Sequence, residues 1–468
     1  MITLKSARII RKDLRTRMPF RYGIVTLTEL PHVFIRVRAE IDGQLVEGVA
    51  ADHLPPKWFT KDPERDPLEE IKDMLQVIEQ AMDFATEIEA DSVFAWWWRL
   101  FKQQDAWGCQ HHIETLLTHF GTSLLERALI DAFCRSRAQP FHQLLHDNAF
   151  GVDWSLCQAE LAGTDWQKSL PQRPLAAATL RHTVGMVDVL TENQLTEATR
   201  LKDGLPQSLE ACITHYGLKD FKLKLSGDAD ADLDRLRAIA AVIQRQAPDD
   251  YGFSLDANEQ FNQPAELRSF GERVYADSAL ANFFEHILFI EQPLSRKVAL
   301  QVEQSDVRNC WPQAVPILID ESDGGWDDLP RALALGYSGV SHKNCKGVFK
   351  GLRNLCLVQQ HKVAQPGDRH WMTSAEDLCN IGPVALLQDL AVQAAFGNTS
   401  IERNGHHYFA GLSMFDKNIS QALLLLHKDI YQADPSNNCR LYAKDGCIHL
   451  NSINQASFGV KFVPDLIN

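Results

Sequence analysis

Hydrophobic positions follow two different rhythms in the N-terminal part of the chain. In Val33–Ile41 apolar and polar residues alternate, and the turn-forming pair Asp42 and Gly43 follows. Alternation that ends in such a pair is typical of a β-hairpin, with QLVEGVAA as the returning strand. Farther on, apolar residues recur at helical spacing, most clearly in Leu124–Ala138. We therefore predict an antiparallel meander followed by helices over residues 65–135.

From about residue 175 the pattern changes to short apolar runs, most of them followed by an amphipathic stretch such as Asp230–Gln246. The eight runs are TLRHTVG, FKLKL, GFSLDA, LFIEQP, PILIDES, GVSHK, HWMTSAED and SIERNG. Strands that alternate with helices predict a parallel sheet. Eight strands favour a closed (β/α) barrel, although an open doubly wound sheet shows the same alternation. No G-x-G-x-x-G follows the first run, which disfavours a dinucleotide-binding sheet.

These rhythms divide the chain into three predicted parts. We expect an α+β domain over residues 1–120 and a barrel domain over residues 121–410. Residues 411–468 lack the β/α alternation, and we expect this segment to pack back on the N-terminal domain.

Composition and charge exclude several classes of function. The 468 residues are 45% hydrophobic and 23% charged, as in ordinary globular proteins. A net charge of −14 argues against a nucleic-acid partner, which would require a basic face. We find neither a signal segment nor an apolar run near the roughly 20 residues of a membrane span, so we expect no membrane partner. The ten cysteines form no C-x-x-C pair, which disfavours a zinc motif and indicates reduced thiols in a cytoplasmic protein.

Charged residues and one asparagine gather at the ends of six successive runs. They are Lys222 and Lys224, Asp256 and Asn258, Glu291, Asp320 and Glu321, Lys343 and Lys346, and Glu376 and Asp377. The ends of parallel barrel strands meet at one mouth, where active sites are built. Taken alone, each motif has an ordinary explanation, because an acidic residue can cap a helix and a K-x-K pair is usually solvated. In a strand, however, both lysines of K-x-K face the same side.

The acidic residues of this set predict a metal site. Three carboxylates close together repel one another, and a divalent cation removes that conflict. Mg²⁺ prefers oxygen ligands, and Asp256, Glu291 and Asp320 would supply one oxygen each from neighbouring strands. The lysines flank this trio, and a lysine beside a cation or a second lysine has a lowered pKa and can act as a base. Removal of the proton next to a carboxylate requires a stabilised enediolate, which a metal provides.

The order KLK, DAN, IEQP, DES and K-x-x-K resembles the enolase superfamily, specifically its mandelate racemase/muconate lactonizing enzyme family. The resemblance covers about residues 1–400, and MPFRYG and LLERALIDAF are similar to the capping domain and linking helix of that family. It implies a modified (β/α)7β TIM-type barrel with an α+β capping domain. It also implies Mg²⁺ as cofactor and a homo-oligomer.

The resemblance also assigns roles to individual residues. It makes Asp256, Glu291 and Asp320 the metal ligands and Lys224 the base on one face of the substrate. Lys222 would tune the pKa of Lys224 and touch the substrate carboxylate. Lys343 would be the acid or base on the opposite face of the substrate. The implied supporting residues are Asn258, Glu321, Lys346 and Glu376.

The second base is assigned less directly than the first. The residue before the lysine, apolar in the family, is His342 here, and a Gly-Gly pair is replaced by Gly347 and Val348. These departures leave both Lys343 and Lys346 open as the second base. We favour Lys343 because it lies closer to the end of the strand.

Substrate specificity is expected to come from loops above the barrel and from the loop after its last strand. The candidates are Arg21, Tyr22, His53 and Lys57 in the first group, and Arg403, His406 and His407 in the second.

The function implied is Mg²⁺-assisted abstraction of a proton next to the carboxylate of a small molecule. Racemisation or epimerisation, cycloisomerisation and dehydration share this first step, so the sequence leaves the outcome open. Two other functions remain. A Schiff-base lyase would use a strand-end lysine against a carbonyl but would leave three acids without a role. A non-catalytic protein could also keep the fold.

Overall fold

The computed structural model describes residues 1–365, 367 and 371–464. Its N-terminal part is an antiparallel sheet in the order β3-β2-β1-β4. The strands are β1 (Ile2–Tyr22), β2 (Val25–Ile41), β3 (Gln44–His53) and β4 (Glu89–Ala90). The turn between β2 and β3 contains Asp42 and Gly43 at φ 50° and 80°, which is the left-handed conformation that the hairpin requires. The hairpin predicted from the sequence is therefore present, with Ile41 paired with Gln44 across the turn.

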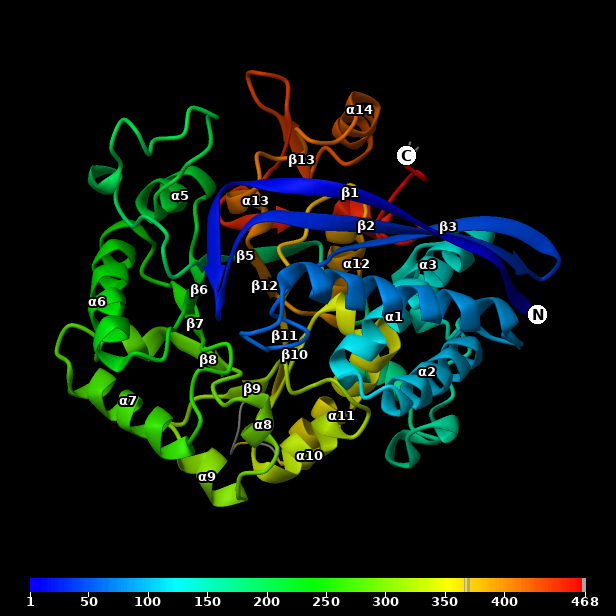
Figure 1. Ribbon diagram of the computed structural model, residues 1–468, viewed down its shortest axis with the longest axis horizontal. Helices are drawn as coiled ribbons and strands as arrows, with labels where there is room; N and C mark the ends of the chain where they lie inside the picture. Colours follow the sequence, from blue (N-terminus) through cyan, green and yellow to red (C-terminus); the bar gives the residue numbers. More distant parts are fainter. Residues whose placement is uncertain (366, 368–370, 465–468) are drawn as a thin grey trace.

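Three helices cover one face of this sheet (Figure 1). They are α1 (Pro67–Glu87), α2 (Val93–Gln110) and α3 (Thr115–Arg137). Asp66 begins α1 by accepting a hydrogen bond from the backbone N–H of Leu68. Gly48 lets α3 approach β3, because a Cβ at this position would lie 2.1 Å from the carbonyl oxygen of Ala128. The sheet and helices form the predicted α+β cap.

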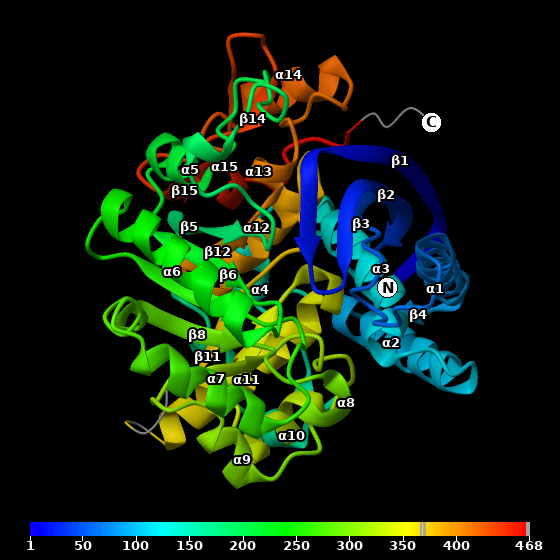
Figure 2. The same ribbon diagram turned by 60° about the vertical axis from the view of Figure 1, so that its left-hand side comes forward.

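Eight parallel strands form a closed barrel beside the cap (Figures 1 and 2). The strands are β5 (Ala177–Val184), β6 (Asp220–Lys224), β7 (Gly252–Asp256), β8 (Ile287–Glu291), β9 (Ile317–Ile319), β10 (Gly339–His342), β11 (Met372–Ala375) and β12 (Ser400–Arg403). Their order follows the sequence, and β12 pairs with β5 to close the ring. All eight apolar runs form strands, so a TIM-type barrel with a capping domain is confirmed and the open sheet is excluded.

The helices of the barrel domain form a layer in which they precede, connect or follow the barrel strands. They are α4 (Phe141–His146), α5 (Leu209–Tyr216), α6 (Ala229–Gln246), α7 (Pro264–Ala276), α8 (Arg296–Ala299), α9 (Gln304–Asn309), α10 (Asp328–Leu335), α11 (Val348–Ala364), α12 (Ala385–Phe396) and α13 (Gly405–Tyr408). Glu126 of α3 links the cap to this layer, because it accepts hydrogen bonds from the N–H groups of Val348 and Phe349 at 3.0 and 2.7 Å.

The C-terminal segment contacts both domains. It contains α14 (Lys417–Leu426), β13 (Tyr431–Ala433), β14 (Cys439–Leu441), β15 (Cys447–His449) and α15 (Asn451–Asn454). The ring of Phe415 meets His32 and Phe34 of the cap sheet edge-on, whereas β15 pairs antiparallel with barrel strand β5. The predicted domain boundaries remain a proposal. Helix α3 continues across the domain boundary that was predicted at residue 120.

The length and polarity of the helices and the state of the cysteines bear on the expectations for a membrane partner and for reduced thiols. In the described part of the chain, every helix is too short or too polar to cross a bilayer. All ten cysteines are free thiols.

Candidate active site

The alternation of side chains along the strands directs one set of polar residues into the barrel. Lys222 and Lys224 of β6 face inward, and Lys224 pairs in register with Asp256 at the end of β7. Asp256 in turn pairs with Glu291 at the end of β8. Asp320 follows β9, and Lys343 follows β10. Sequence periodicity and barrel closure together bring these side chains to one mouth.

Lys222 lies at the centre of a ring of carboxylates. Its Nζ is 2.9 Å from Asp256 Oδ2, 2.7 Å from Glu291 Oε2, 2.7 Å from Glu376 Oε2 and 3.1 Å from Glu402 Oε2. The lysine side chain is only 1% exposed. Such a buried charge is tolerable only because several opposite charges surround it.

Two further lysines approach the same acids from opposite sides. Lys224 Nζ lies 2.5 Å from Asp256 Oδ2 and donates to Asn258 Oδ1 at 2.8 Å. Lys343 Nζ contacts Asp320 and lies 3.4 Å from Glu291 Oε1. Strands β6 and β10 are four positions apart in a ring of eight, so these two lysines enter the mouth from opposite walls.

The structure separates the two candidates for the second base. Lys343 lines the cavity at the mouth. Lys346 instead donates to the carbonyl oxygens of Asp320 and Ser341 at 2.7 and 2.9 Å and does not line this cavity. His342, the departure noted in the sequence, faces outward to α11. Gly351 leaves space for it there, because a Cβ would lie 2.3 Å from the imidazole.

The electrostatics of the mouth differ from the sequence-based expectation. Burial lowers the pKa of Lys222, but its carboxylate neighbours, Asp256 foremost, raise that pKa well above the ordinary value. Burial also lowers the pKa of Lys343, but the carboxylates of Asp320 and Glu291 raise that pKa well above the ordinary value. Burial raises the pKa of Glu291 to about 7. For Lys222 and Lys343 the pKa is therefore raised and not lowered, because each of these two ammonium groups contacts at least two carboxylates.

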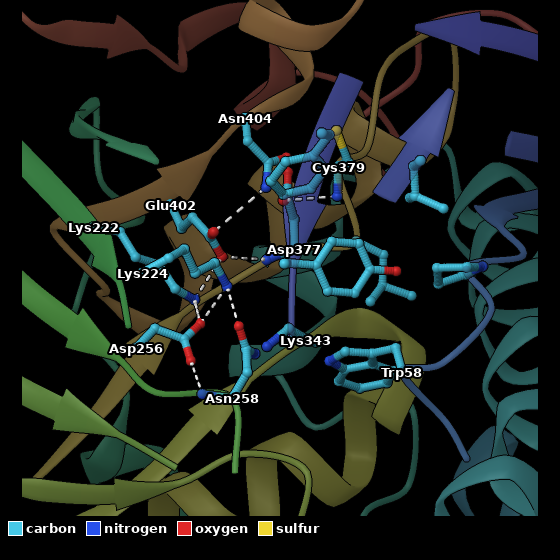
Figure 3. A pocket seen from close by; sticks show the side chains of 15 residues that line it. Trp58, Lys222, Lys224, Asp256, Asn258, Lys343, Asp377, Cys379, Glu402 and Asn404 are labelled. Carbon is cyan, nitrogen blue, oxygen red and sulfur yellow. Dashed lines mark hydrogen bonds and ion pairs between the residues drawn. The ribbon is translucent and has the colours of Figure 1, made fainter. Parts of the chain in front are cut away.

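A cavity lies between the cap and the barrel mouth (Figure 3). Its polar wall comes from the barrel and consists of Lys222, Lys224, Asp256, Asn258, Lys343, Asp377, Cys379, Glu402 and Asn404. Its apolar wall is formed by Phe20, Tyr22, Leu27, Pro55, Trp58 and Leu378, of which all but Leu378 belong to the cap. The Nζ of Lys343 lies 5.2 Å from the centre of the Trp58 ring.

Of the four cap residues proposed for specificity, Tyr22 lines this cavity. Arg21, next to it in β1, is exposed, and Lys57 is held by the carbonyl oxygens of Asp62 and Arg65. His53 is fully buried in the cap, where its Nδ1 lies 3.2 Å from His32 Nδ1. Arg21 faces away from the cavity that Tyr22 lines, because adjacent residues of a strand face opposite sides.

The candidates after the last strand lie behind the barrel wall. Arg403 pairs with Asp377 at 3.2 Å and with Asp389. His406 and His407 are buried outside the lining of the cavity. The position before Arg403 reaches the mouth instead, because Glu402 faces inward. Sequence reasoning missed Glu402, although its alternation with Arg403 in a strand carried the signal.

The supporting residues are close to the proposed ligands. Asn258 donates from Nδ2 to Glu321 Oε1 at 3.1 Å, and its backbone N–H donates to Asp256 Oδ1 at 2.8 Å. Glu376 also pairs with Arg181 of β5, in the interior of the barrel. These bonds restrain the acids at the mouth.

The acids have the donor chemistry of a magnesium site. Asp256, Glu291 and Asp320 offer only oxygen atoms, from three consecutive strands. Glu291 Oε2 and Asp320 Oδ1 are buried without a hydrogen bond from any described residue, and each faces a lysine ammonium group at 2.7 and 2.8 Å. A cation there would take over the role of the positive charge that Lys222 supplies to Glu291 Oε2 and Lys346 supplies to Asp320 Oδ1, so the residues fit Mg²⁺.

Comparison with known proteins gives one family match. Residues 205–428 match the family model described as enolase C-terminal domain-like. Among curated proteins, none matches the sequence.

Several solved structures share the fold over nearly the whole chain. The muconate lactonizing enzyme from Pseudomonas fluorescens, complexed with muconolactone, is 18% identical with a TM-score of 0.60, over 96% of this chain and 94% of that one. The dipeptide epimerase from Enterococcus faecalis, complexed with Mg and the dipeptide L-Leu-L-Tyr, is 14% identical with a TM-score of 0.59, over 96% and 100%. An enolase from Bradyrhizobium, complexed with magnesium and mandelic acid, is 15% identical with a TM-score of 0.57, over 96% and 93%. At these identities the likeness is one of fold.

Proposed function

We propose that this chain, whose residues 205–428 match the enolase C-terminal domain-like family model, is an enzyme that removes the proton next to a carboxylate. The proposed substrate is a small carboxylate, and the proposed outcome is racemisation or epimerisation, cycloisomerisation or dehydration. Enzymes named for two of these outcomes, an epimerase and a cycloisomerase, share the fold.

One observation carries this proposal. Lys224 and Lys343 reach one cavity from opposite walls of the barrel, and the carboxylates of Asp256, Glu291 and Asp320 lie between them. A proton next to a carboxylate leaves perpendicular to the plane of the forming enediolate. Bases above and below that plane are therefore the arrangement this chemistry needs.

The two lysines divide the proton transfers. One of them, as a neutral amine, takes the α-proton from its side of the substrate and becomes an ammonium group. If the other lysine then gives its own proton to the same carbon from the opposite side, the configuration inverts. If one lysine acts alone, the electron pair of the broken C–H bond forms a double bond to the β-carbon, and the bond from that carbon to its β-substituent breaks. A β-hydroxyl group that takes up a proton leaves as water, which is dehydration. Loss of a ring carboxylate oxygen from the β-carbon opens a lactone, which is cycloisomerisation in the reverse direction.

Asp256, Glu291 and Asp320 would hold Mg²⁺, which when bound supplies positive charge toward the two oxygens of the substrate carboxylate. Lys222 keeps Asp256, Glu291, Glu376 and Glu402 together, since its ammonium group contacts all four.

The walls of the cavity indicate the substrate class. The barrel side is charged, whereas the cap side presents Phe20, Tyr22, Leu27 and Trp58. A carboxylate bound at the lysines would direct its remaining part to this apolar wall. We therefore propose a carboxylate with an apolar or aromatic substituent, whose desolvation contributes to binding.

The proposal also covers location and assembly. The ten free thiols support a cytoplasmic location for the protein, because reducing conditions there preserve thiols. A homo-oligomer is proposed from the family resemblance alone.

The experiment is α-proton exchange in D₂O, followed by NMR. The panel contains mandelate, N-acyl amino acids, dipeptides and acid sugars, each with and without Mg²⁺. We expect exchange with at least one apolar or aromatic member, and only in the presence of Mg²⁺. Absence of exchange across the panel, in protein that binds Mg²⁺, would favour a non-catalytic member of the fold. Covalent trapping of a carbonyl substrate by borohydride would favour the Schiff-base lyase.

A further inference from the structure

A second cluster of chemically reactive side chains lies outside the barrel mouth. His182 of β5, Cys212 of α5 and His407 of α13 converge so that one ligand atom from each lies within 4.8 Å of the others. All three are buried. Figures 1 and 2 show β5, α5 and α13 side by side, although they are far apart in the sequence. Neither the fold nor the proposed reaction requires a thiol and two imidazoles at this place.

The cluster is separated from the active site by the barrel wall. Thr183, the neighbour of His182 in β5, faces the barrel interior and donates to Glu402 Oε1 at 2.6 Å. Because side chains alternate along a strand, His182 faces the opposite side, toward α5 and α13. The two sites also differ in chemistry, since the mouth offers oxygen ligands and this cluster offers sulfur and nitrogen.

The spacing of the donor atoms suits a tetrahedral metal ion. His407 Nδ1 lies 3.5 Å from Cys212 Sγ. Zinc binds cysteine sulfur at about 2.3 Å and histidine nitrogen at about 2.0–2.1 Å, which at the tetrahedral angle separates the two donors by about 3.5 Å. The rings of His182 and His407 are 4.9 Å apart between centroids and nearly perpendicular, at 71°. Two imidazoles can therefore present nitrogen atoms to a common point without stacking.

The second nitrogen of each imidazole already has a partner. His407 Nε2 lies 3.7 Å from Asp188 Oδ2, and that oxygen also accepts from Tyr408 Oη at 2.6 Å and from the N–H of Gly185 at 2.7 Å. His182 Nδ1 lies 3.0 Å from His406 Nε2. In histidines that bind metals, a carboxylate or another polar group beside the other ring nitrogen commonly orients the ring.

We propose that His182, Cys212 and His407 bind a zinc ion through Nε2, Sγ and Nδ1, with a fourth position left for water. Thiolate and imidazole ligands select zinc over magnesium, which prefers oxygen. On binding, the thiol of Cys212 loses its proton to solvent and the sulfur–zinc bond forms, so one proton is released per ion. The ion ties β5 and α5 to α13, whose preceding residue Asn404 lines the cavity. Its role is to hold the loop that shapes one wall of the active site.

Cobalt(II) is the probe for this site, because it replaces zinc and reports its ligands through its absorption spectrum. The full-length chain is freed of metal by chelation, saturated with Mg²⁺ to fill the mouth, and titrated with Co²⁺. We expect one Co²⁺ per chain, a thiolate-to-cobalt charge-transfer band, the intense visible bands of four-coordinate cobalt, and displacement by Zn²⁺. Absence of the charge-transfer band in the parent chain would overturn the proposal.

Variants assign the ligands. Cys212→Ser is expected to abolish the charge-transfer band, whereas Cys439→Ser, which alters another buried thiol, is expected to retain it. Asp188→Asn should keep the band but weaken Co²⁺ binding about 10–100-fold, because it removes only the orienting carboxylate. Asp256→Asn, at the mouth, should leave the titration unchanged. An unchanged band in Cys212→Ser would overturn the assignment.

One measurement needs no variant, which covers the case in which Cys212→Ser fails to fold. X-ray absorption at the zinc edge of the parent chain is expected to show one sulfur and two imidazole nitrogens around the ion. A shell made only of oxygen and nitrogen would contradict the proposal. The result is independent of the proposed reaction, because α-proton exchange and zinc coordination are measured separately.

Discussion

Lys224 and Lys343 line the same cavity from strands that are half a turn apart in the barrel. Lys224 is held by Asp256 and Asn258, whereas Lys343 is held by Asp320 and faces the ring of Trp58. The two amines therefore approach a bound molecule from different sides and have different partners. Each of the following predictions tests one consequence of this arrangement or of its surroundings.

Lys224→Ala and Lys343→Ala should each lower steady-state turnover of a true substrate by about 10²–10⁴-fold, the usual effect of losing a general base. In a racemase, each variant would still exchange the α-proton of one enantiomer in D₂O, because the remaining lysine faces that side. Lys72→Ala, which removes an exposed lysine of α1, serves as the matched control. Full turnover in either active-site variant would exclude that lysine from the mechanism. Loss with Lys224→Ala only would favour a one-base elimination.

Glu291→Gln and Asp320→Asn should weaken Mg²⁺ binding measured by calorimetry. Loss of a residue that merely orients a ligand commonly costs about 10–100-fold in metal affinity, and loss of a ligand should cost at least as much. Asp234→Asn, an exposed acid on α6, is the control and should bind Mg²⁺ like the parent chain. Unchanged affinity in both test variants would refute this magnesium site without reference to activity.

Trp58→Ala should raise KM for an apolar substrate and also lower kcat. The indole forms part of the apolar wall, and it lies over the Lys343 ammonium group, an attraction worth about 0.5–2 kcal/mol. Arg21→Ala should leave both constants unchanged, because Arg21 is exposed beside the cavity-lining Tyr22. A steady-state panel of substrates measures both variants. A changed substrate preference in Arg21→Ala alone would support the original assignment of this residue.

Acid should destabilise the cap through His53. Burial holds the pKa of His53 at about 3, below the ordinary value of 6.5. A pKa that is lower in the folded state gives stability that is complete above pH 6.5 and is lost as the pH falls from 6.5 toward 3. Each pH unit in this window costs about 1.4 kcal/mol per histidine.

Urea unfolding between pH 5 and 7 measures this contribution. His53→Gln should reduce the pH dependence of the unfolding free energy by about one proton, because glutamine does not titrate. His449→Gln, which removes an exposed histidine of β15, should leave the dependence unchanged. Equal slopes in the parent chain and His53→Gln would show that His53 is not the titrating group. His32, its buried partner at 3.2 Å, would then be the next residue to replace.

The elements of the fold were predictable from the sequence because the patterns that encode them are local. The Asp42–Gly43 turn and the eight apolar runs each depend on residues a few positions apart, and each forms the predicted element. Closure of the sheet, by contrast, depends on the pairing of β12 with β5, which are the last and the first barrel strands in the sequence. The alternation of strands and helices left the barrel and the open sheet as alternatives, the family resemblance favoured the barrel, and the tertiary structure decided between them.

The same distinction holds for the site. Order along the chain was enough to propose Asp256, Glu291 and Asp320 as a group, because parallel strands end at one edge. Whether Lys343 or Lys346 enters the cavity depends on the direction of each side chain after the strand ends. The raised pKa of Lys343 depends on acids from two other strands.

The cluster of His182, Cys212 and His407 shows this limit most clearly. Its members come from three segments without motif spacing, so the absence of a C-x-x-C pair disfavoured zinc when only local patterns were considered. Local periodicity determined which elements form and which way their residues alternate. Only the packing of distant segments, driven by burial of their apolar faces, decided which side chains meet.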